Sequence, residues 1–234
     1  MNTPGMRTID ATQGIRILDS RATASLLSKV LWITTVGFLF TALGAYMAPA
    51  VLGGIGYGAL FLITLGLIFA INFATRRSPT LALVLFYVFT LLMGVEVGPL
   101  IKQYLHVPGG TAVVFQAAAT TAAGMFVMGV VAQFARFDYR KVYSYVFVAL
   151  IALVILGVLS YFVHWISPGF YAWATLAIFS VLLLIDFMRL KDGALGLSPV
   201  QMALSIYLDA LNIFIALLQI FGSNSGSRRD SNWR

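Results

Sequence analysis

No cysteine occurs in this chain, and charged residues make up only 10% of its 234 residues. The lack of cysteine excludes disulfide bonds, thiolate catalysis and metal sites built on cysteine ligands. The scarcity of charge accompanies 60% hydrophobic residues and a mean hydropathy of +0.93, a composition unlike that of a soluble domain of this length. We therefore expect a membrane protein.

Histidine is almost as scarce, since His106 and His164 are the two in the sequence and they lie far apart. The chain has no His-Glu-x-x-His, Gly-x-Ser-x-Gly or phosphate-loop motif. Intramembrane aspartyl proteases use two aspartates, but Tyr207-Leu-Asp209 lacks the Gly-x-Gly-Asp sequence typical of them. We therefore expect no enzymatic activity and no cofactor.

The sequence is rich in apolar runs of about 20 residues, the length that crosses a bilayer. Short polar breaks between these runs make successive helices antiparallel neighbours. The expected fold class is all-α: a polytopic membrane protein with a seven-transmembrane-helix bundle over 26–222, a cytoplasmic N-terminal tail over 1–25 and a polar C-terminal tail over 223–234. The predicted spans are 26–48, 50–73, 81–104, 111–134, 142–164, 169–190 and 200–222.

The basic residues indicate orientation. Those before the first span and in alternate loops outnumber those in the opposite loops, where Lys102 stands alone, so the N-terminus is expected in the cytoplasm and the C-terminus outside. The C-terminal tail fits an external position less well, because it carries Arg228, Arg229 and Arg234. A re-entrant last segment, which would keep both ends inside, is therefore an alternative. The net charge of +7 forms no stripe, so we expect contacts to anionic lipid rather than nucleic acid.

Paired small residues recur within the spans at or near the spacing that lets membrane helices approach closely. The pairs are Gly37 and Gly44, Gly54 and Gly58, and Gly94 and Gly98. We expect them to mark helix–helix contacts.

Two aspartates, Asp186 and Asp209, lie within apolar sequence near the C-terminus. A carboxylate inside a membrane span costs about 2.5–3.5 kcal/mol on insertion scales and usually has a function. The midpoint between them falls in Gly196-Leu-Ser-Pro199, which is typical of a helix stop and turn. Two antiparallel helices joined there would hold the carboxyls at one depth, within hydrogen-bonding reach. Two such groups in a dry site cannot both ionise easily, so the pair predicts a proton-sensitive element.

Ser205, Asp209 and Asn212 share one face of the last span, which predicts a helix in the middle of the bundle. The polar side chains on this face could form structural hydrogen bonds between helices, or they could be part of a cation pathway. Asp186 has Arg189 three residues later, so a local ion pair is an alternative to an aspartate pair. Glu96, in the outer third of the third span, could attract cations or be structural.

The segment Ala203-Leu-Ser-Ile-Tyr-Leu-Asp-Ala-Leu-Asn-Ile-Phe214 resembles the last helix of the Bax inhibitor family. Ile178-Phe-Ser-Val-Leu-Leu-Leu-Ile-Asp186 and Gly94-Val-Glu-Val-Gly-Pro99 resemble its sixth-helix and third-helix motifs, although Glu96 departs from the usual apolar or small residue. Arg76 falls where bacterial members carry an arginine at the end of the second helix. The resemblance covers about 22–222 and implies six helices around a central seventh.

The resemblance also implies a function. Bacterial members of this kind are pH-sensitive calcium leak channels of the inner membrane, gated by a hydrogen-bonded aspartate pair with an arginine that can join one of them. By motif these roles fall on Asp186, Asp209 and Arg76, with transient calcium near the aspartates and no firm metal site. Other members modulate a membrane-bound AAA protease without transport, and this is the alternative. Some of those lack the aspartates, so both aspartates here favour the leak.

Overall fold

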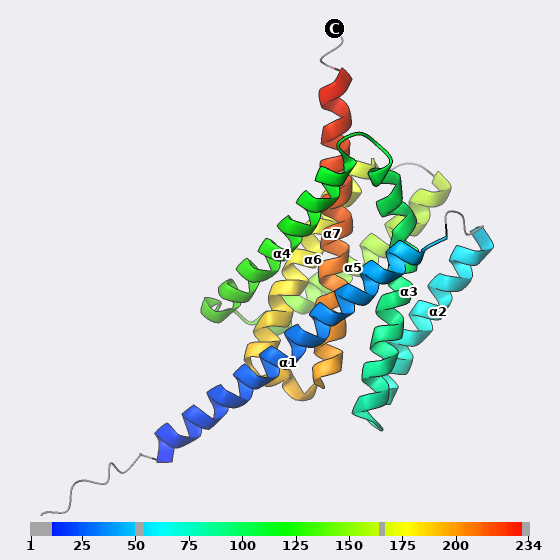
Figure 1. Cartoon of the computed structure of the whole chain (residues 1–234). Coiled ribbons are helices and arrows are strands. Elements are labelled where there is room, and N and C mark those ends of the chain that lie inside the picture. The colour runs from blue at the N-terminus through cyan, green and yellow to red at the C-terminus, as the bar shows by residue number, and fades with distance from the viewer. Residues whose placement is uncertain (1–10, 50–53, 164–166, 231–234) are drawn as a thin grey trace, which may run out of the picture.

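The computed structural model describes residues 11–49, 54–163 and 167–230, which form an all-helical bundle (Figure 1). Pro168 and Pro199, each in the first turn of its helix, suit that position because proline lacks the N–H that goes unpaired there. The elements are α1 Ala11–Met47, α2 Gly54–Ala74, α3 Pro79–Leu105, α4 Gly110–Phe134, α5 Tyr139–Val163, α6 Pro168–Lys191, the 3-10 helix η1 Gly193–Gly196 and α7 Pro199–Asp230.

Seven of these helices are long and apolar enough to cross a membrane, so the predicted fold class is confirmed. The ends differ from expectation, because α1 begins at Ala11, well before its apolar stretch Thr23–Met47. Likewise α7 continues to Asp230, past its apolar stretch Pro199–Ser223. That 25-residue stretch of unbroken helix is about 37 Å long at about 1.5 Å per residue, more than the hydrocarbon core of about 30 Å. This length favours a full seventh span over the re-entrant alternative.

The last helix is the centre of the bundle, as the sequence predicted. Most of the apolar stretch of α7 is buried, and the helix packs against α1, α3, α4 and α6. Figure 1 shows it running the full height of the molecule between its neighbours. By contrast α5 packs mainly on α6, and α2 mainly on α3. Side chains of α7 can therefore interact with several helices while remaining out of contact with lipid.

Close approach of α1 and α3 depends on three of the predicted small residues. A Cβ on Gly44 would collide with the backbone carbonyl of Leu91, and one on Gly94 would collide with that of Thr41. A Cβ on Gly98 would lie 2.5 Å from the Cβ of Ala48. The predicted contact role is thus confirmed for these glycines. It is not seen at Gly58, where an added Cβ would meet nothing within 4 Å.

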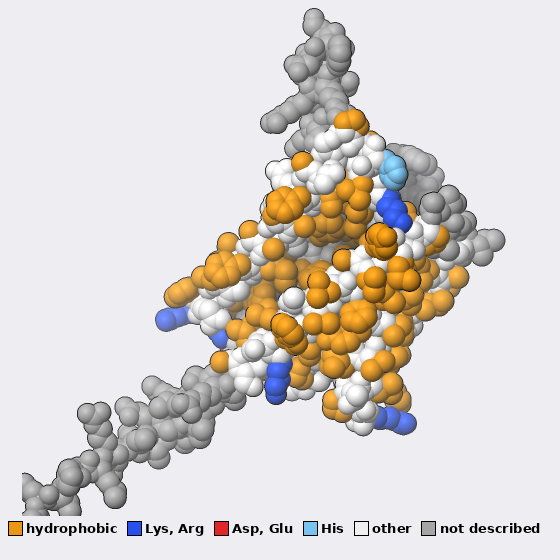
Figure 2. Space-filling view, in the orientation of Figure 1, with side chains coloured by type: hydrophobic (Ala, Val, Ile, Leu, Met, Phe, Trp, Pro, Cys, Tyr) orange, Lys and Arg blue, Asp and Glu red, His pale blue; other side chains and the backbone are white. Residues whose placement is uncertain are grey.

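The outer surface is mainly apolar, as expected of a protein surrounded by lipid. In Figure 2 hydrophobic side chains cover most of the described face, and basic side chains gather along its lower edge. That edge is the end at which α7 begins, as the same view in Figure 1 shows. The bundle therefore has one strongly basic end.

Candidate functional site

The hairpin of α6 and α7 positions the site. Gly193 and Gly196 both adopt positive φ, near 78° and 82°, which reverses the chain through η1. Ser198 and Gln201 then form a reciprocal cap at the start of α7: the Ser198 N–H donates to Gln201 Oε1 (3.0 Å), and the Gln201 N–H donates to Ser198 Oγ (3.2 Å). The predicted turn is confirmed, and it makes α6 and α7 antiparallel neighbours.

Both aspartates are buried inside this hairpin. Asp186 on α6 is 2% exposed and Asp209 on α7 is 5% exposed. The two carboxyl groups are close enough to repel one another electrostatically. Oδ2 of each is buried with no hydrogen-bond partner, which is rare for a polar atom inside a protein. The structure therefore brings the two residues together, while the shared hydrogen bond between them stays a prediction.

Arg189 supplies the nearby positive charge. Its Nη1 donates to Asp186 Oδ1 at 3.1 Å, an i,i+3 pair within α6. The guanidinium also lies 5.5 Å from the centroid of the Tyr143 ring on α5, and it acts electrostatically on Asp209. The local ion pair that the sequence left as an alternative is thus present, and it coexists with the aspartate pair. Arg189 thus faces both carboxyl groups.

Arg76 lies elsewhere in this structure. It is exposed in the turn after α2, and α2 packs mainly on α3 rather than on α6 or α7. Among the residues described here, the ion pair observed is the one between Arg189 and Asp186. A role for Arg76 beside the aspartates stays a prediction about another state of the protein.

The polar face of α7 lies alongside the aspartates. Ser205 interacts with the Asp186 carboxyl across the α6–α7 contact. One turn beyond Asp209, the Asn212 amide donates to the Leu208 carbonyl at 2.8 Å. Asn212 also lines a cavity of about 120 Å³ between α5, α6 and α7. The other polar side chains lining that cavity are Tyr171, Thr175 and Gln219.

Glu96 belongs to a different part of the bundle. It is half-buried on α3, and its Oε1 accepts a hydrogen bond of 2.8 Å from Thr64 Oγ1 on α2. Its carboxyl group therefore ties α2 to α3. Glu96 also acts electrostatically on Tyr207 of α7, and it is not among the groups that act on Asp186 or Asp209.

Sequence reasoning missed a second buried polar cluster, which centres on Tyr207. The Tyr207 hydroxyl lies 2.6 Å from Thr41 Oγ1, which in turn approaches the carbonyls of Gly37 and Thr90 at 3.0 Å. A threonine hydroxyl has one proton, so Tyr207 donates to Thr41 and Thr41 donates to a carbonyl. This chain ties α7 to α1 and α3. The sequence around Tyr207 gave no signal of this contact, because its partner Thr41 lies 166 residues away on α1.

Within the described residues no group of three or more His, Asp or Glu side chains could hold a metal ion. Two carboxylates and one hydroxyl can still offer oxygen ligands to a passing hard cation. The site is therefore suited to transient contact with a cation or a proton.

A seven-helix membrane bundle with a buried carboxyl pair on its central helix hairpin is the class of protein that this fold and site define. Residues 23–226 match the family described as inhibitor of apoptosis-promoting Bax1, and the chain belongs to that Bax inhibitor-like family. The resemblance seen in the sequence is thus confirmed.

Relatives in several bacteria are similar over most of their length. An uncharacterised protein of Campylobacter jejuni is 29% identical over 204 residues, 87% of each chain. An uncharacterised membrane protein of Streptococcus pyogenes serotype M1 is 33% identical over 72% of this chain and 74% of its own. An uncharacterised protein of Helicobacter pylori is 31% identical over 69% of this chain and 70% of its own.

Proposed function

We propose that this protein is a pH-sensitive leak channel for calcium, or another cation, in the bacterial inner membrane, with its N-terminus in the cytoplasm. The observation that carries the proposal is the buried pair Asp186 and Asp209, each with an unpartnered Oδ2. Buried ionisable residues inside membrane bundles commonly mark ion or proton pathways. Family membership supports the proposal, and neither a cofactor nor a catalytic group is part of it.

The gate would work by charge repulsion. Two unit charges about 4 Å apart repel by about 4 kcal/mol at an effective dielectric constant of about 20. One shared proton removes this repulsion and lets the carboxyls bridge α6 and α7, which is the closed state. Loss of that proton leaves two anions beside one cation, Arg189, so the hairpin opens. Flux should therefore rise with pH.

The charged groups around the pair support this assignment. Arg189 interacts with both carboxyls, whereas Lys191 directs its ammonium to the carbonyls of Ala132 and Ala135 at the end of α4. Lys29 on α1 is exposed, and Glu96 on α3 is engaged by Thr64. Among the described side chains, Arg189 is the cation that acts on both aspartates, and it can offset one negative charge but not two.

Calcium is the proposed cargo because it prefers carboxylate and other oxygen ligands. Asp186, Asp209 and Ser205 present such oxygens at the α6–α7 contact, and Asn212 adds a side-chain carbonyl one turn further along. A divalent cation between the aspartates could replace the proton and relieve the same repulsion. These contacts would be transient, as conduction requires.

The direct test is calcium entry into liposomes that contain the purified protein and a trapped calcium indicator. We expect entry above that of protein-free liposomes, and faster entry at pH 8 than at pH 6. Entry equal to that of protein-free liposomes at every pH would reject the leak. It would favour the alternative function as a non-transporting partner of a membrane-bound AAA protease.

A further inference from the structure

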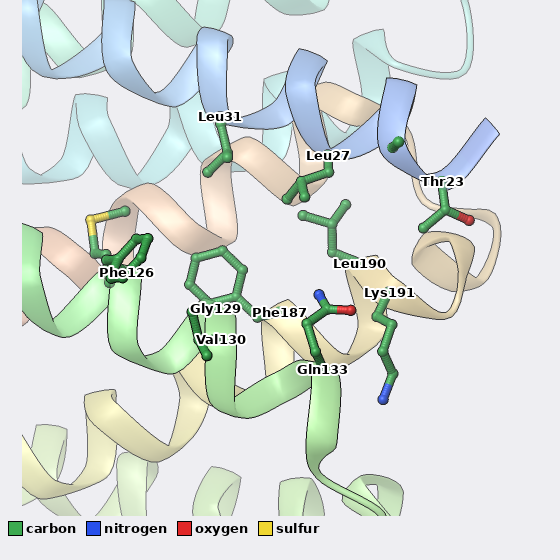
Figure 3. Close-up of a pocket in the computed structure, with 12 residues that line it drawn as sticks. Thr23, Leu27, Leu31, Phe126, Gly129, Val130, Gln133, Phe187, Leu190 and Lys191 are labelled. Carbon is green, nitrogen blue, oxygen red and sulfur yellow. The ribbon is translucent and has the colours of Figure 1, made fainter. Parts of the chain in front are cut away.

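A cavity between α1, α4 and α6 is separate from the polar face of α7. It has a volume of about 710 Å³ and is open at the surface of the bundle (Figure 3). Leu27 and Leu31 point into it from α1, and Val130 lies on α4. Its floor is formed by Phe187 and Leu190 of α6. We call this space the α1–α4 slot.

The walls of the slot are mainly apolar, and the slot opens on the outer surface of the bundle. Leu31 is 37% exposed and Phe126 is 74% exposed, so both side walls reach the surface. A second, mainly apolar cavity of about 330 Å³ lies between α1, α3, α4 and α7 and shares Met125 with the first. An extended hydrocarbon chain in the slot would point toward this second cavity.

One end of the slot is polar and carries a positive charge. Gln133 and Lys191 line it there. Lys191 Nζ donates to the carbonyls of Ala132 (2.9 Å) and Ala135 (3.3 Å), and an ammonium has three donors, so one N–H remains for another acceptor. This end lies at the basic end of the bundle. The slot thus combines a long apolar body with a single cationic end, which is complementary to a lipid with an anionic headgroup.

We propose that the α1–α4 slot binds one acyl chain of an anionic membrane phospholipid, with the headgroup phosphate beside Lys191. A transmembrane helix is a poorer occupant, because a helix with its side chains is about 10–12 Å across. A helix of that width is too large for a cavity of about 710 Å³. The slot is also a poor candidate for a water-filled cation pathway, because its walls are mainly apolar. The site is distinct from the aspartate pair and does not depend on the leak function.

The position of the slot connects it to the aspartate hairpin. Phe187 follows Asp186 directly in sequence, and Leu190 lies one helical turn from Asp186 on the same side of α6. A bound chain would therefore press on the residues that flank the aspartate. Lipid in the slot would stabilise the α6 position in which Asp186 pairs with Arg189.

Gly129 offers a way to fill the slot without distorting the fold. A Cβ there would lie 3.8 Å from the Phe187 ring, which is ordinary van der Waals contact, so a longer side chain would extend into the slot. Gly124 is the matched control on the same helix, because a Cβ there meets nothing within 4 Å and Gly124 does not line the slot.

The test uses the full-length protein in nanodiscs doped with a phosphatidylglycerol that carries a photoreactive acyl chain, followed by peptide mapping. We expect labelling on α1 and α4, with unlabelled phosphatidylglycerol competing better than phosphatidylcholine. Gly129→Leu should lower this labelling about tenfold, because the side chain displaces several methylenes, and Gly124→Leu should not. Lys191→Gln should remove the preference for phosphatidylglycerol while leaving the label in place.

Several results would overturn the proposal. They are unchanged labelling in Gly129→Leu, equal loss in Gly124→Leu, and equal competition by the two lipids in the unmodified protein. Protection of the slot by a second copy, seen as protein–protein crosslinks at α1 and α4 in place of lipid adducts, would also overturn it. All of these readouts are independent of calcium flux, so failure of the leak proposal would leave them interpretable.

Discussion

At the scale of single residues, the site is defined by two buried carboxyls and one arginine. Arg189 pairs with Asp186 at 3.1 Å, while its side chain remains 22% exposed. A partly exposed ion pair usually contributes little to stability, because solvent screens it and ordering the two side chains costs entropy. Its main effect should be on which protonation state of the aspartates is favoured.

Replacement of Arg189 by alanine tests that role. Without its cation the carboxyl pair should hold its shared proton more readily, so the pH midpoint of calcium entry should rise by about 0.5–1 pH unit. Arg76→Ala is the comparison, because Arg76 is exposed in the turn after α2, whereas Arg189 is the cation that pairs with Asp186. A pH midpoint unchanged in Arg189→Ala would contradict the role assigned to it. An equal rise in Arg76→Ala would show that Arg76 joins the pair in another state.

At the scale of helices, the contact between α1 and α3 should depend on its glycines. Gly44→Ala places a Cβ against the Leu91 carbonyl, so the helices must separate, at a cost of about 1–3 kcal/mol. The thermal midpoint in detergent should fall accordingly. Gly58→Ala on α2 adds its Cβ in open space and improves helix propensity, so it should be neutral or slightly stabilising. Equal effects of the two substitutions would argue against the observed packing.

The cavity between α5, α6 and α7 should contain water, because polar side chains inside a membrane protein need hydrogen-bond partners. The chain lacks cysteine, so single cysteines can be introduced without background. Thr175→Cys and Gln219→Cys should react with a small charged thiol reagent, whereas Ile155→Cys, which is 53% exposed on α5, should be protected by lipid. Equal protection of all three positions would show the cavity to be dry.

Much of the helical architecture could be predicted from sequence, because the signals for it are local. Span length, the Gly-Leu-Ser-Pro turn and the burial of the last helix follow from composition and spacing within about 25 residues. The start of α1 at Ala11 was missed because polar and charged residues over 11–22 interrupt the apolar pattern, so the predicted helix began with the apolar run. The contact of Tyr207 with Thr41 was missed because it depends on how α7 is rotated against α1, which no local pattern fixes.

At the scale of the whole molecule, the aspartate pair could be predicted because two positions symmetric about a turn must lie at one depth. The partner cation could not be chosen on the same grounds. Arg76 and Arg189 both lie near the end of the bundle where α6 and α7 are joined, since Asn72 of α2 hydrogen-bonds Gln201 of α7, and the structure pairs Asp186 with Arg189. Tertiary packing thus decided what sequence spacing left open.

The seven spans predict that the two ends of the chain lie on opposite sides of the membrane. The distribution of basic residues predicts a cytoplasmic N-terminus and hence a periplasmic C-terminus. A reporter fused after Arg234 that is active only in the periplasm should be active, and one active only in the cytoplasm should be silent. The reverse pattern would show that α7 does not cross the membrane completely.

The most direct test of the account is the pH profile of calcium entry into liposomes for Asp186→Asn and Asp209→Asn. Asparagine keeps the shape of the side chain and removes the titrating group. Each variant should therefore lose most of the pH dependence, whatever its absolute rate. Glu96→Gln is the matched control, since its carboxyl binds Thr64 away from the pair, and it should keep the wild-type midpoint. If both Asn variants retain the wild-type pH profile, the aspartates are structural and the proposed gate is wrong.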